Sequence, residues 1–209
     1  MSKYKGKRVL VVGFGISGVA AARYMCKQGA KVTVTDLKQK SELMDSVNAC
    51  AELKVEYELG RHNPKTFHLA ELIVVSPGIP LNIKPLEEAR EKLVPITNEI
   101  EMAVSGLNAP LIAITGTNGK TTTTTLLDEM FKADAKSVFV GGNIGNPLLN
   151  YLTEELTTEA ILAELSSFQL ELSEKLVPAV ALFTNIEEDH LDRYPDMQAY
   201  IAAKKRLLR

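Results

Sequence analysis

Apolar residues in the first half of the chain come in short runs that alternate with helix-like stretches. The run RVLVVG at 8–13 ends in glycine, as is typical of a buried parallel strand. The same pattern predicts strands at 31–36, near residue 57, at 72–78 and at 94–97, and helices over 17–28, 42–53 and 83–93. This βαβ alternation predicts an α/β fold with a Rossmann-like parallel sheet.

The alternation restarts after a Gly/Asn/Pro turn that ends the helix-like stretch beginning at residue 98. Strands are predicted at 110–115, 137–142, 159–165 and 179–186, and helices over 119–133 and 197–209. We therefore expect one domain over 1–97 and a second α/β domain over 98–209. Because the second domain stops inside a helix-like stretch with no closing strand, we expect it to be incomplete and the chain to be truncated.

The composition and the net charge exclude several classes of protein. With 45% hydrophobic and 24% charged residues, the chain resembles an ordinary globular protein. Its net charge of -2 gives no electrostatic reason to expect nucleic acid or an anionic membrane as a partner. The basic start followed by the apolar run at 9–22 imitates a signal peptide, but glycines interrupt that run. We expect a cytoplasmic protein in which Cys26 and Cys50 are free thiols.

The first candidate site is a glycine-rich turn between a predicted strand and a predicted helix. Gly13, Gly15 and Gly18 form G-x-G-x-x-G, and Asp36 ends the next strand. Such glycines allow a tight turn and a close approach of a phosphate to the helix N-terminus, while the acidic residue commonly binds a ribose hydroxyl. From the residues alone, the pattern predicts a dinucleotide site for NAD. A glycine turn that only packs strand against helix is the alternative.

A second glycine-rich turn, Gly116-Thr117-Asn118-Gly119-Lys120-Thr121, follows the strand 110–115 and opens a helix. Its backbone N–H groups suit phosphate oxygens, Lys120 suits their charge, and the Thr121 hydroxyl suits Mg²⁺. The general P-loop has a glycine where this chain has Ile114, so the turn is a variant. The run of five threonines has poor helix propensity, which favours a role in ligand binding.

Polar residues also follow the next strands of the second half. Glu164, Ser166 and Ser167 come after one strand, and Asn185, Asp189 and His190 come after another. The carboxyl ends of parallel strands meet at one edge of a sheet, so these residues are expected near the second turn, around Mg²⁺ or substrate. His62 and His68 lack such a context, and we expect them to be surface residues.

These motifs together resemble the Mur ligases, the ATP-dependent amide-bond-forming enzymes of peptidoglycan precursor synthesis. The resemblance rests on ITGTNGKTT, GGNIG (141–145), TNIEEDHLDRY (184–194) and AYIAAKKR (199–206), which occur in the family's order. ELSSFQLE (164–171), GFGISG and SPGIP are similar to the D-glutamate-adding members. In that family the Rossmann-like domain binds the UDP end of a nucleotide-sugar substrate, so two glycine turns would serve two nucleotides.

The resemblance implies a set of site residues. The UDP-substrate residues would be Gly15, Ile16, Ser17, Asp36, Leu37, Lys38, Gly78 and Asn143. The ATP-binding residues would be Gly116, Thr117, Asn118, Gly119, Lys120, Thr121 and Thr122. The catalytic residues would be Lys120, Glu164, His190 and Lys204, and the Mg²⁺ ligands would be Thr121, Glu164, His190 and Lys204, the last as a carbamate. Carbamylation requires a neutral amine, so Lys204 should have a lowered pKa.

The implied reaction joins D-glutamate to UDP-N-acetylmuramoyl-L-alanine through an acyl phosphate formed with ATP. In the family a third domain holds the amino-acid substrate, and nothing in this sequence supplies it. We therefore expect a monomer that does not complete the reaction by itself. Two alternatives stay open from the residues: an NAD-dependent oxidoreductase, which leaves the second turn unexplained, and a nucleotide-binding module without catalysis.

Overall fold

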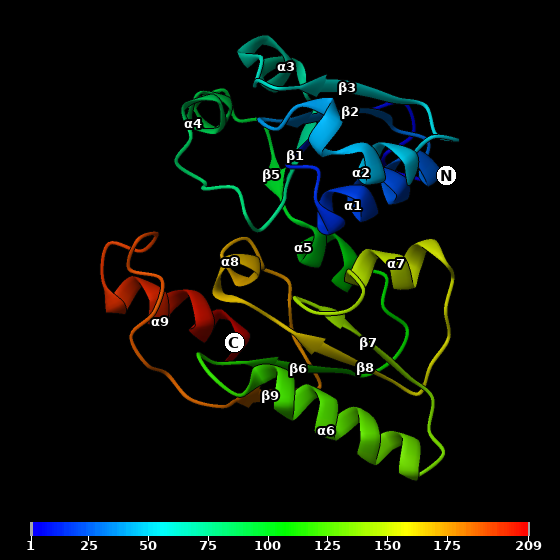
Figure 1. The fold of residues 1–209 in the computed structure, drawn as a ribbon, viewed down its shortest axis with the longest axis vertical. Helices are drawn as coiled ribbons and strands as arrows, with labels where there is room; N and C mark the ends of the chain where they lie inside the picture. The colour runs from blue at the N-terminus through cyan, green and yellow to red at the C-terminus, as the bar shows by residue number, and fades with distance from the viewer. Residues whose placement is uncertain (1, 209) are drawn as a thin grey trace. The chain divides into compact units, whose positions relative to one another are not determined.

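The computed structural model describes residues 2–208, in two compact units. The first unit ends at Glu99 and the second begins at Ile100. Each unit is built around its own parallel sheet (Figure 1), which confirms the predicted α/β class. No helix within residues 2–208 is long and apolar enough to cross a bilayer.

The first unit contains a five-stranded sheet in the order β3-β2-β1-β4-β5, with every pair parallel. Its strands are β1 (Arg8–Val12), β2 (Lys31–Asp36), β3 (Val55–Leu59), β4 (Leu72–Val75) and β5 (Ile96–Thr97). Its helices are α1 (Ile16–Lys27), η1 (Lys40–Glu42), α2 (Met44–Asn48), α3 (Pro64–Leu69) and α4 (Lys84–Glu91), and α5 (Glu99–Val104) follows. The strand order reverses between β1 and β4, so right-handed crossovers send α1 and α2 to one face and α3 and α4 to the other (Figure 1).

The core of this unit lies where α1 packs on β1 and β2. Four consecutive residues of β1, from Val9 to Val12, are buried, as is Val34 of β2, because both faces of this part of the sheet are covered. On α1, Ala20, Ala21 and Ala22 are buried, and their small side chains let the helix lie close to the strands. The strand-and-helix pattern therefore fixes the position of the glycine turn at the carboxyl end of β1.

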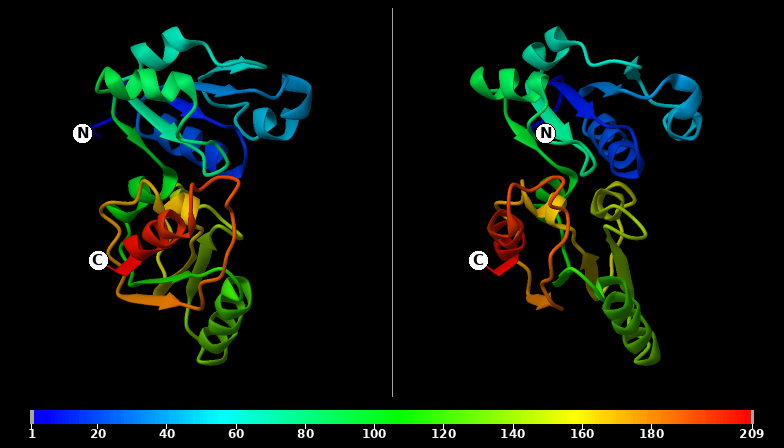
Figure 2. Two further views of the ribbon diagram at one scale, coloured as in Figure 1. Left: turned by 90° about the vertical axis from the view of Figure 1, so that its left-hand side faces the viewer. Right: turned by 60° about the vertical axis from the view of Figure 1, so that its left-hand side comes forward.

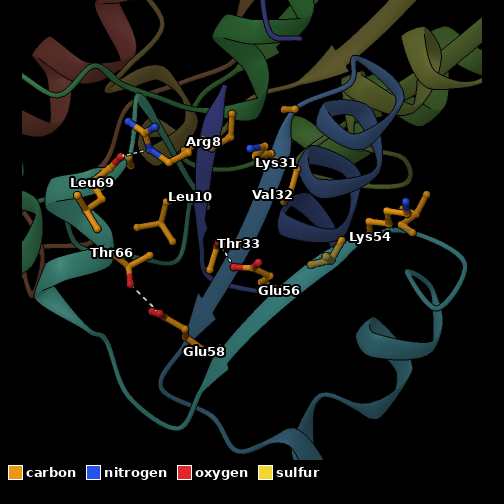
Figure 3. A pocket seen from close by; sticks show the side chains of 15 residues that line it. Arg8, Leu10, Lys31, Val32, Thr33, Lys54, Glu56, Glu58, Thr66 and Leu69 are labelled. Atoms are coloured by element: carbon orange, nitrogen blue, oxygen red, sulfur yellow. Dashed lines mark hydrogen bonds between the residues drawn. The ribbon is translucent and has the colours of Figure 1, made fainter. Parts of the chain in front are cut away.

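The other face of the first sheet is only partly covered. Because α3 is six residues long, the amino-terminal halves of β1, β2 and β3 border an open pocket of about 650 Å³ (Figure 3). Its lining mixes charged and apolar side chains, with Thr33 donating a hydrogen bond to Glu56 and Thr66 donating one to Glu58. None of the predicted site residues is among the described residues that line this pocket.

The second unit contains a four-stranded parallel sheet in the order β7-β8-β6-β9. Its strands are β6 (Leu111–Thr115), β7 (Val138–Gly142), β8 (Ala160–Glu164) and β9 (Val180–Phe183). Its helices are α6 (Lys120–Ala133), α7 (Leu148–Thr153), α8 (Ser167–Leu170), α9 (Met197–Lys205) and η2 (Arg206–Leu208). Figures 1 and 2 agree in showing α6 on one face of the sheet and α7 and α8 on the other.

The structure differs from the sequence pattern in its short helices. The predicted helix over 42–53 is shorter and ends at Asn48, and α3, α7 and α8 were not predicted. These three helices have only four to six residues, too few for a helical period to show. Two of them do carry start signals, since Asn63 caps α3 and Ser166 forms a capping box with Gln169 at α8.

Candidate functional site

The first glycine turn is held together by contacts between β1, β4 and α1. Ser76 donates its hydroxyl to the carbonyl oxygen of Gly13 over 2.9 Å. A Cβ on Gly18 would lie 2.0 Å from that same carbonyl oxygen, so only glycine allows α1 to start this close to β1. Gly13 itself has a φ of +88°, a conformation that favours glycine.

Asp36, at the end of β2, is bonded to the backbone of this turn and of its own loop. Its Oδ2 accepts the Phe14 N–H at 2.7 Å and its Oδ1 accepts the Lys38 N–H at 2.9 Å. Each carboxylate oxygen keeps the capacity to accept a further hydrogen bond. Asp36 therefore fixes the shape of the glycine turn in addition to any contact with a nucleotide.

The remaining predicted residues of the first unit surround this turn. Gly15, Ile16 and Ser17 form the start of α1, Leu37 and Lys38 follow β2, and Gly78 follows β4. Ile16 is 73% exposed and Leu37 is 65% exposed, so two apolar side chains stand open beside the turn. Asn143, the last of the predicted UDP-substrate residues, lies in the second unit.

His62 and His68, expected at the surface, are partly exposed and partly buried. His62 is half-buried, its Nδ1 lies 2.9 Å from the Thr35 hydroxyl, and burial lowers the pKa of its imidazole. His68 belongs to α3 and faces α4, with its Nε2 3.1 Å from Glu88 Oε2 and its Nδ1 2.8 Å from Lys92 Nζ. Both side chains stay partly exposed, and each also contacts a neighbouring element: His62 packs against Phe67 of α3, and His68 contacts Glu88 of α4.

The second glycine turn runs from Gly116 to the first turn of α6. Gly119 is the N-cap residue of α6 with φ +79°, and Gly116 has φ +145°. A Cβ on Gly116 would lie 2.0 Å from the Thr184 hydroxyl, so this turn approaches the chain after β9 as closely as glycine permits. The first N–H groups of a helix have no intrahelical acceptor, and here they open toward the turn.

The segment after β9 holds the second turn in place. Asn185 pairs its side-chain amide with Asn118, accepting the N–H at 2.9 Å and donating to the carbonyl at 3.1 Å. Glu187 accepts a bond from the Asn118 side chain at 2.9 Å, and its backbone N–H donates to the Thr117 hydroxyl at 3.0 Å. The turn is therefore ordered by side chains about seventy positions further along the chain.

Two lysines donate to carbonyl oxygens of this same turn. Lys120 Nζ donates to Thr117 O at 2.6 Å, and Lys204 Nζ, from α9, donates to Gly116 O at 2.7 Å. Lys204 is only 2% exposed. Burial, and secondarily the charge of Lys120, lowers the pKa of Lys204 to about 8. A buried amine with this pKa is neutral far more often than an ordinary lysine at physiological pH.

Glu164 lies at the end of β8, facing the start of α6. Its Oε2 accepts the Thr121 hydroxyl at 2.8 Å and its Oε1 accepts the Asn143 amide at 3.1 Å. The side chain is almost completely buried, and each of its two oxygens accepts one of these hydrogen bonds. The structure thus brings together three of the predicted residues, although they come from three separate parts of the second unit.

His190 belongs to a cluster of rings beside Lys204. Its ring centroid lies 4.8 Å from that of Phe168 and 6.0 Å from that of Tyr200, while Lys204 Nζ lies 4.8 Å from the Tyr200 centroid. Tyr200 also places its hydroxyl 3.1 Å from the hydroxyl of Thr117. His190 has φ +56°, an uncommon backbone conformation for a residue other than glycine.

Some of the predicted Mg²⁺ ligands suit this ion and others do not. No cluster of three or more His, Cys, Asp or Glu side chains able to hold a metal occurs within residues 2–208. Mg²⁺ needs fewer protein ligands, because it usually keeps waters and is completed by phosphate oxygens. The Thr121 hydroxyl and the Glu164 carboxylate are hard oxygen donors 2.8 Å apart, and they fit that pattern. Lys204 does not fit as an unmodified amine, because its Nζ donates to Gly116.

Several residues of this site were missed from the sequence. Phe168, Tyr200 and Glu187 contact the turn or the ring cluster, yet no site role was predicted for them. Glu187 sits in the same segment as Asn185 and His190, so position relative to β9 was the available signal. Nothing in the sequence alone marks Tyr200 as a partner of Thr117, 83 positions away.

Comparison with known families matches both units. The family model of the Mur ligase MurD-like N-terminal domain matches residues 7–98, and that of the Mur ligase middle domain matches residues 114–209. Among solved structures, the chain is similar in fold to the UDP-N-acetylmuramate:L-alanyl-gamma-D-glutamyl-meso-diaminopimelate ligase of Neisseria meningitides, at 17% sequence identity. The match covers 98% of this chain and 68% of that chain, with a TM-score of 0.62. The solved murein peptide ligase of Psychrobacter arcticus is also 17% identical. Its match covers 97% of this chain and 47% of that chain, with a TM-score of 0.56.

Curated relatives are much more similar in sequence. The UDP-N-acetylmuramoylalanine–D-glutamate ligase of Geotalea daltonii is 52% identical over 203 residues, and the enzyme of the same name from Desulfatibacillum aliphaticivorans is 49% identical. Each alignment covers 97% of this chain. The chain spans 45% of the length of each of these relatives.

Proposed function

The chain belongs to the Mur ligase family, and on that premise we propose that it carries the nucleotide sites of a ligase that adds D-glutamate to UDP-N-acetylmuramoyl-L-alanine. Family membership bears out the resemblance drawn from the motifs. The observation that carries the proposal is the second glycine turn, where Lys120, Lys204 and the Thr121–Glu164 pair converge. ATP would bind there, and the UDP part of the substrate would bind at the first turn.

In the ATP site, the residues from Gly116 to Thr122 would hold the phosphates. Opening of the 2.6 Å bond between Lys120 Nζ and Thr117 O would free the ammonium for the β- and γ-phosphates. Thr121 and Glu164 would hold Mg²⁺, which supplies charge neutralisation to the transferring phosphoryl group when bound. The substrate carboxylate would attack the γ-phosphate to give an acyl phosphate and ADP, and the D-glutamate amine would then displace phosphate.

Lys204 would act as a carbamate. The neutral amine adds CO₂ with loss of one proton, so Nζ keeps one N–H and carries an anionic carboxylate that could ligate a cation. Together with His190, this carbamate would form a second place for Mg²⁺ beside the turn. The support for this role is the burial of Lys204 and its contact with the same ring, Tyr200, that lies near His190.

At the first turn, Asp36 would accept a hydrogen bond from the ribose or uracil of the substrate. It would keep its hydrogen bonds from the backbone N–H groups of Phe14 and Lys38. The exposed side chains of Ile16 and Leu37 would pack on the nucleotide, which removes apolar surface from water. Gly78, where an added Cβ would meet no atom within 4 Å, leaves room on the third side of the turn.

Calorimetric titration of the chain with UDP-N-acetylmuramoyl-L-alanine tests this assignment, with NADH titrated separately. We expect binding of the UDP compound and none of NADH. Asp36→Ala should weaken the binding of the UDP compound, whereas Glu56→Gln, in the same sheet but outside the turn, should leave it unchanged. Binding of NADH in place of the UDP compound would contradict the assignment and support an oxidoreductase.

A further inference from the structure

The buried Glu164 carboxylate is held at both of its oxygens. Thr121 donates to Oε2 from the start of α6, and Asn143 donates to Oε1 from the loop after β7. With the side chain 1% exposed, the two bonds leave the carboxylate little freedom to rotate. Asn143 and Thr121 therefore each hold one oxygen of the Glu164 carboxylate.

The backbone around Asn143 is shaped to reach Glu164. The Asn143 N–H donates to Glu164 O at 2.7 Å, in addition to the bond from its side chain. The preceding residue, Gly142, has φ +98°, and a Cβ there would lie 2.2 Å from Glu164 O. Only glycine permits this approach. Gly142 and Asn143 therefore both contact Glu164, Gly142 through its backbone and Asn143 through its backbone N–H and its side-chain amide.

From this geometry we propose that Asn143 is a positioning residue for Glu164, aiming the carboxylate at the Thr121 hydroxyl and the first turn of α6. The proposal rests on the proposed function, because the phosphate and Mg²⁺ sites give the orientation its purpose. It assigns Asn143 a role different from the substrate contact expected from the sequence. Without the amide, Oε1 loses its donor and the carboxylate turns away from Thr121.

Loss of the Asn143 amide should affect only the part of nucleotide binding that depends on Mg²⁺. Among the described residues, Asn143 donates to Glu164 and not to the glycine turn at 116–122, so its loss leaves the phosphate cradle in place. A hydrogen bond to a charged group supports an effect of about tenfold or more. When Asn143 is replaced, we expect the gain in nucleotide affinity on adding Mg²⁺ to fall by about this factor. The affinity measured without metal should change little.

The experiment is titration of the chain with a non-hydrolysable ATP analogue, once with Mg²⁺ and once with EDTA. Asn143→Leu keeps the size of the side chain and removes both N–H donors. Asn143→Ala is the second variant, suited to an exposed position if the leucine disturbs folding. Asn146→Ala is the matched control, since Asn146 bonds to Gly142 through its backbone carbonyl, which the substitution keeps.

The proposal predicts a Mg²⁺ gain for the wild type and for Asn146→Ala, and a gain at least tenfold smaller for both Asn143 variants. Their affinity in EDTA should stay within about twofold of the wild type, which a general loss of structure would not allow. An unchanged Mg²⁺ gain in both Asn143 variants overturns the proposal alone. A wild type that binds the analogue no better with Mg²⁺ overturns the proposed metal site as well. Weaker binding of UDP-N-acetylmuramoyl-L-alanine with an unchanged Mg²⁺ gain would instead make Asn143 a substrate contact.

Discussion

Lys204 donates a 2.7 Å hydrogen bond from its Nζ to the carbonyl oxygen of Gly116, 88 positions earlier in the chain. This bond joins α9 to the glycine turn that precedes α6. The lysine is buried, so its amine is separated from water and lies within the field of Lys120. A side chain that looks like one of several basic residues in α9 thus becomes part of the proposed nucleotide site.

Carbamylation of Lys204 is the first prediction. With a pKa of about 8, about a quarter of this amine is neutral at pH 7.5, against about one part in a thousand for an ordinary lysine. Incubation with ¹³C-labelled bicarbonate should give a carbamate signal in the NMR spectrum. That signal should disappear in Lys204→Arg and persist in Lys205→Arg, whose side chain is exposed. A signal that survives Lys204→Arg would place the carbamate elsewhere.

Lys120→Met should remove most of the affinity for a nucleoside triphosphate. The substitution keeps an unbranched side chain but deletes the charge expected on the β- and γ-phosphates, a loss of roughly 30-fold or about 2 kcal/mol. Calorimetry with a non-hydrolysable ATP analogue measures the change. Binding of UDP-N-acetylmuramoyl-L-alanine should be unaffected, and an equal loss for both ligands would point to misfolding.

Gly116→Ala should destabilise the second unit. The residue has φ +145°, and the new Cβ would lie 2.0 Å from the Thr184 hydroxyl, so the substitution combines backbone strain with a clash. We expect a loss of roughly 2 kcal/mol or more in the free energy of unfolding, measured by urea denaturation. Gly78→Ala, where a Cβ meets no atom within 4 Å, is the control and should change stability by less than about 0.5 kcal/mol. Equal effects of the two substitutions would refute the assigned geometry.

Cys26 should react slowly with alkylating agents until the pH is high. Burial, and then the neighbouring Cys50, raises the pKa of the Cys26 thiol from 9.0 to about 11. At pH 8 its thiolate fraction should be roughly 100-fold smaller in the folded chain than in the urea-unfolded chain. Below pH 9 both the folded and the unfolded chain hold this proton, so stability does not change with pH there. Between pH 9 and about 11 only the unfolded chain loses the proton, so rising pH lowers the free energy of unfolding in that range. Rates of alkylation at each cysteine, followed by mass spectrometry, check this, and fast labelling at pH 8 would contradict it.

The sequence was sufficient for the features that arise from local pattern. Most strands of both sheets were predicted because each is a short apolar run followed by a turn residue, and the turn at Gly116–Thr121 was predicted from its spacing. The short helices α7 and α8 were not, because four to six residues do not complete a recognisable period. Fold prediction therefore missed helices too short to show a period, and it also extended the helix predicted over 42–53 beyond its observed end at Asn48.

The candidate site was predictable as a set of residues and not as a set of contacts. Glu164 and Thr121 were expected together because parallel strands bring their carboxyl ends to one edge. The burial of Lys204 was not visible in the chain itself, since Lys204 and Lys205 are identical neighbours and only the rotation of α9 decides which faces the turn. The contacts of Tyr200 depend on the same rotation.

Simultaneous binding of two ligands is the most direct test of the claim that two glycine turns serve two nucleotides. The chain is saturated with UDP-N-acetylmuramoyl-L-alanine and then titrated with a non-hydrolysable ATP analogue and Mg²⁺ in a calorimeter. We predict one equivalent of each ligand, with Asp36→Ala weakening only the first and Lys120→Met weakening only the second. Mutual exclusion of the two ligands, or a loss of both in either variant, would contradict the claim.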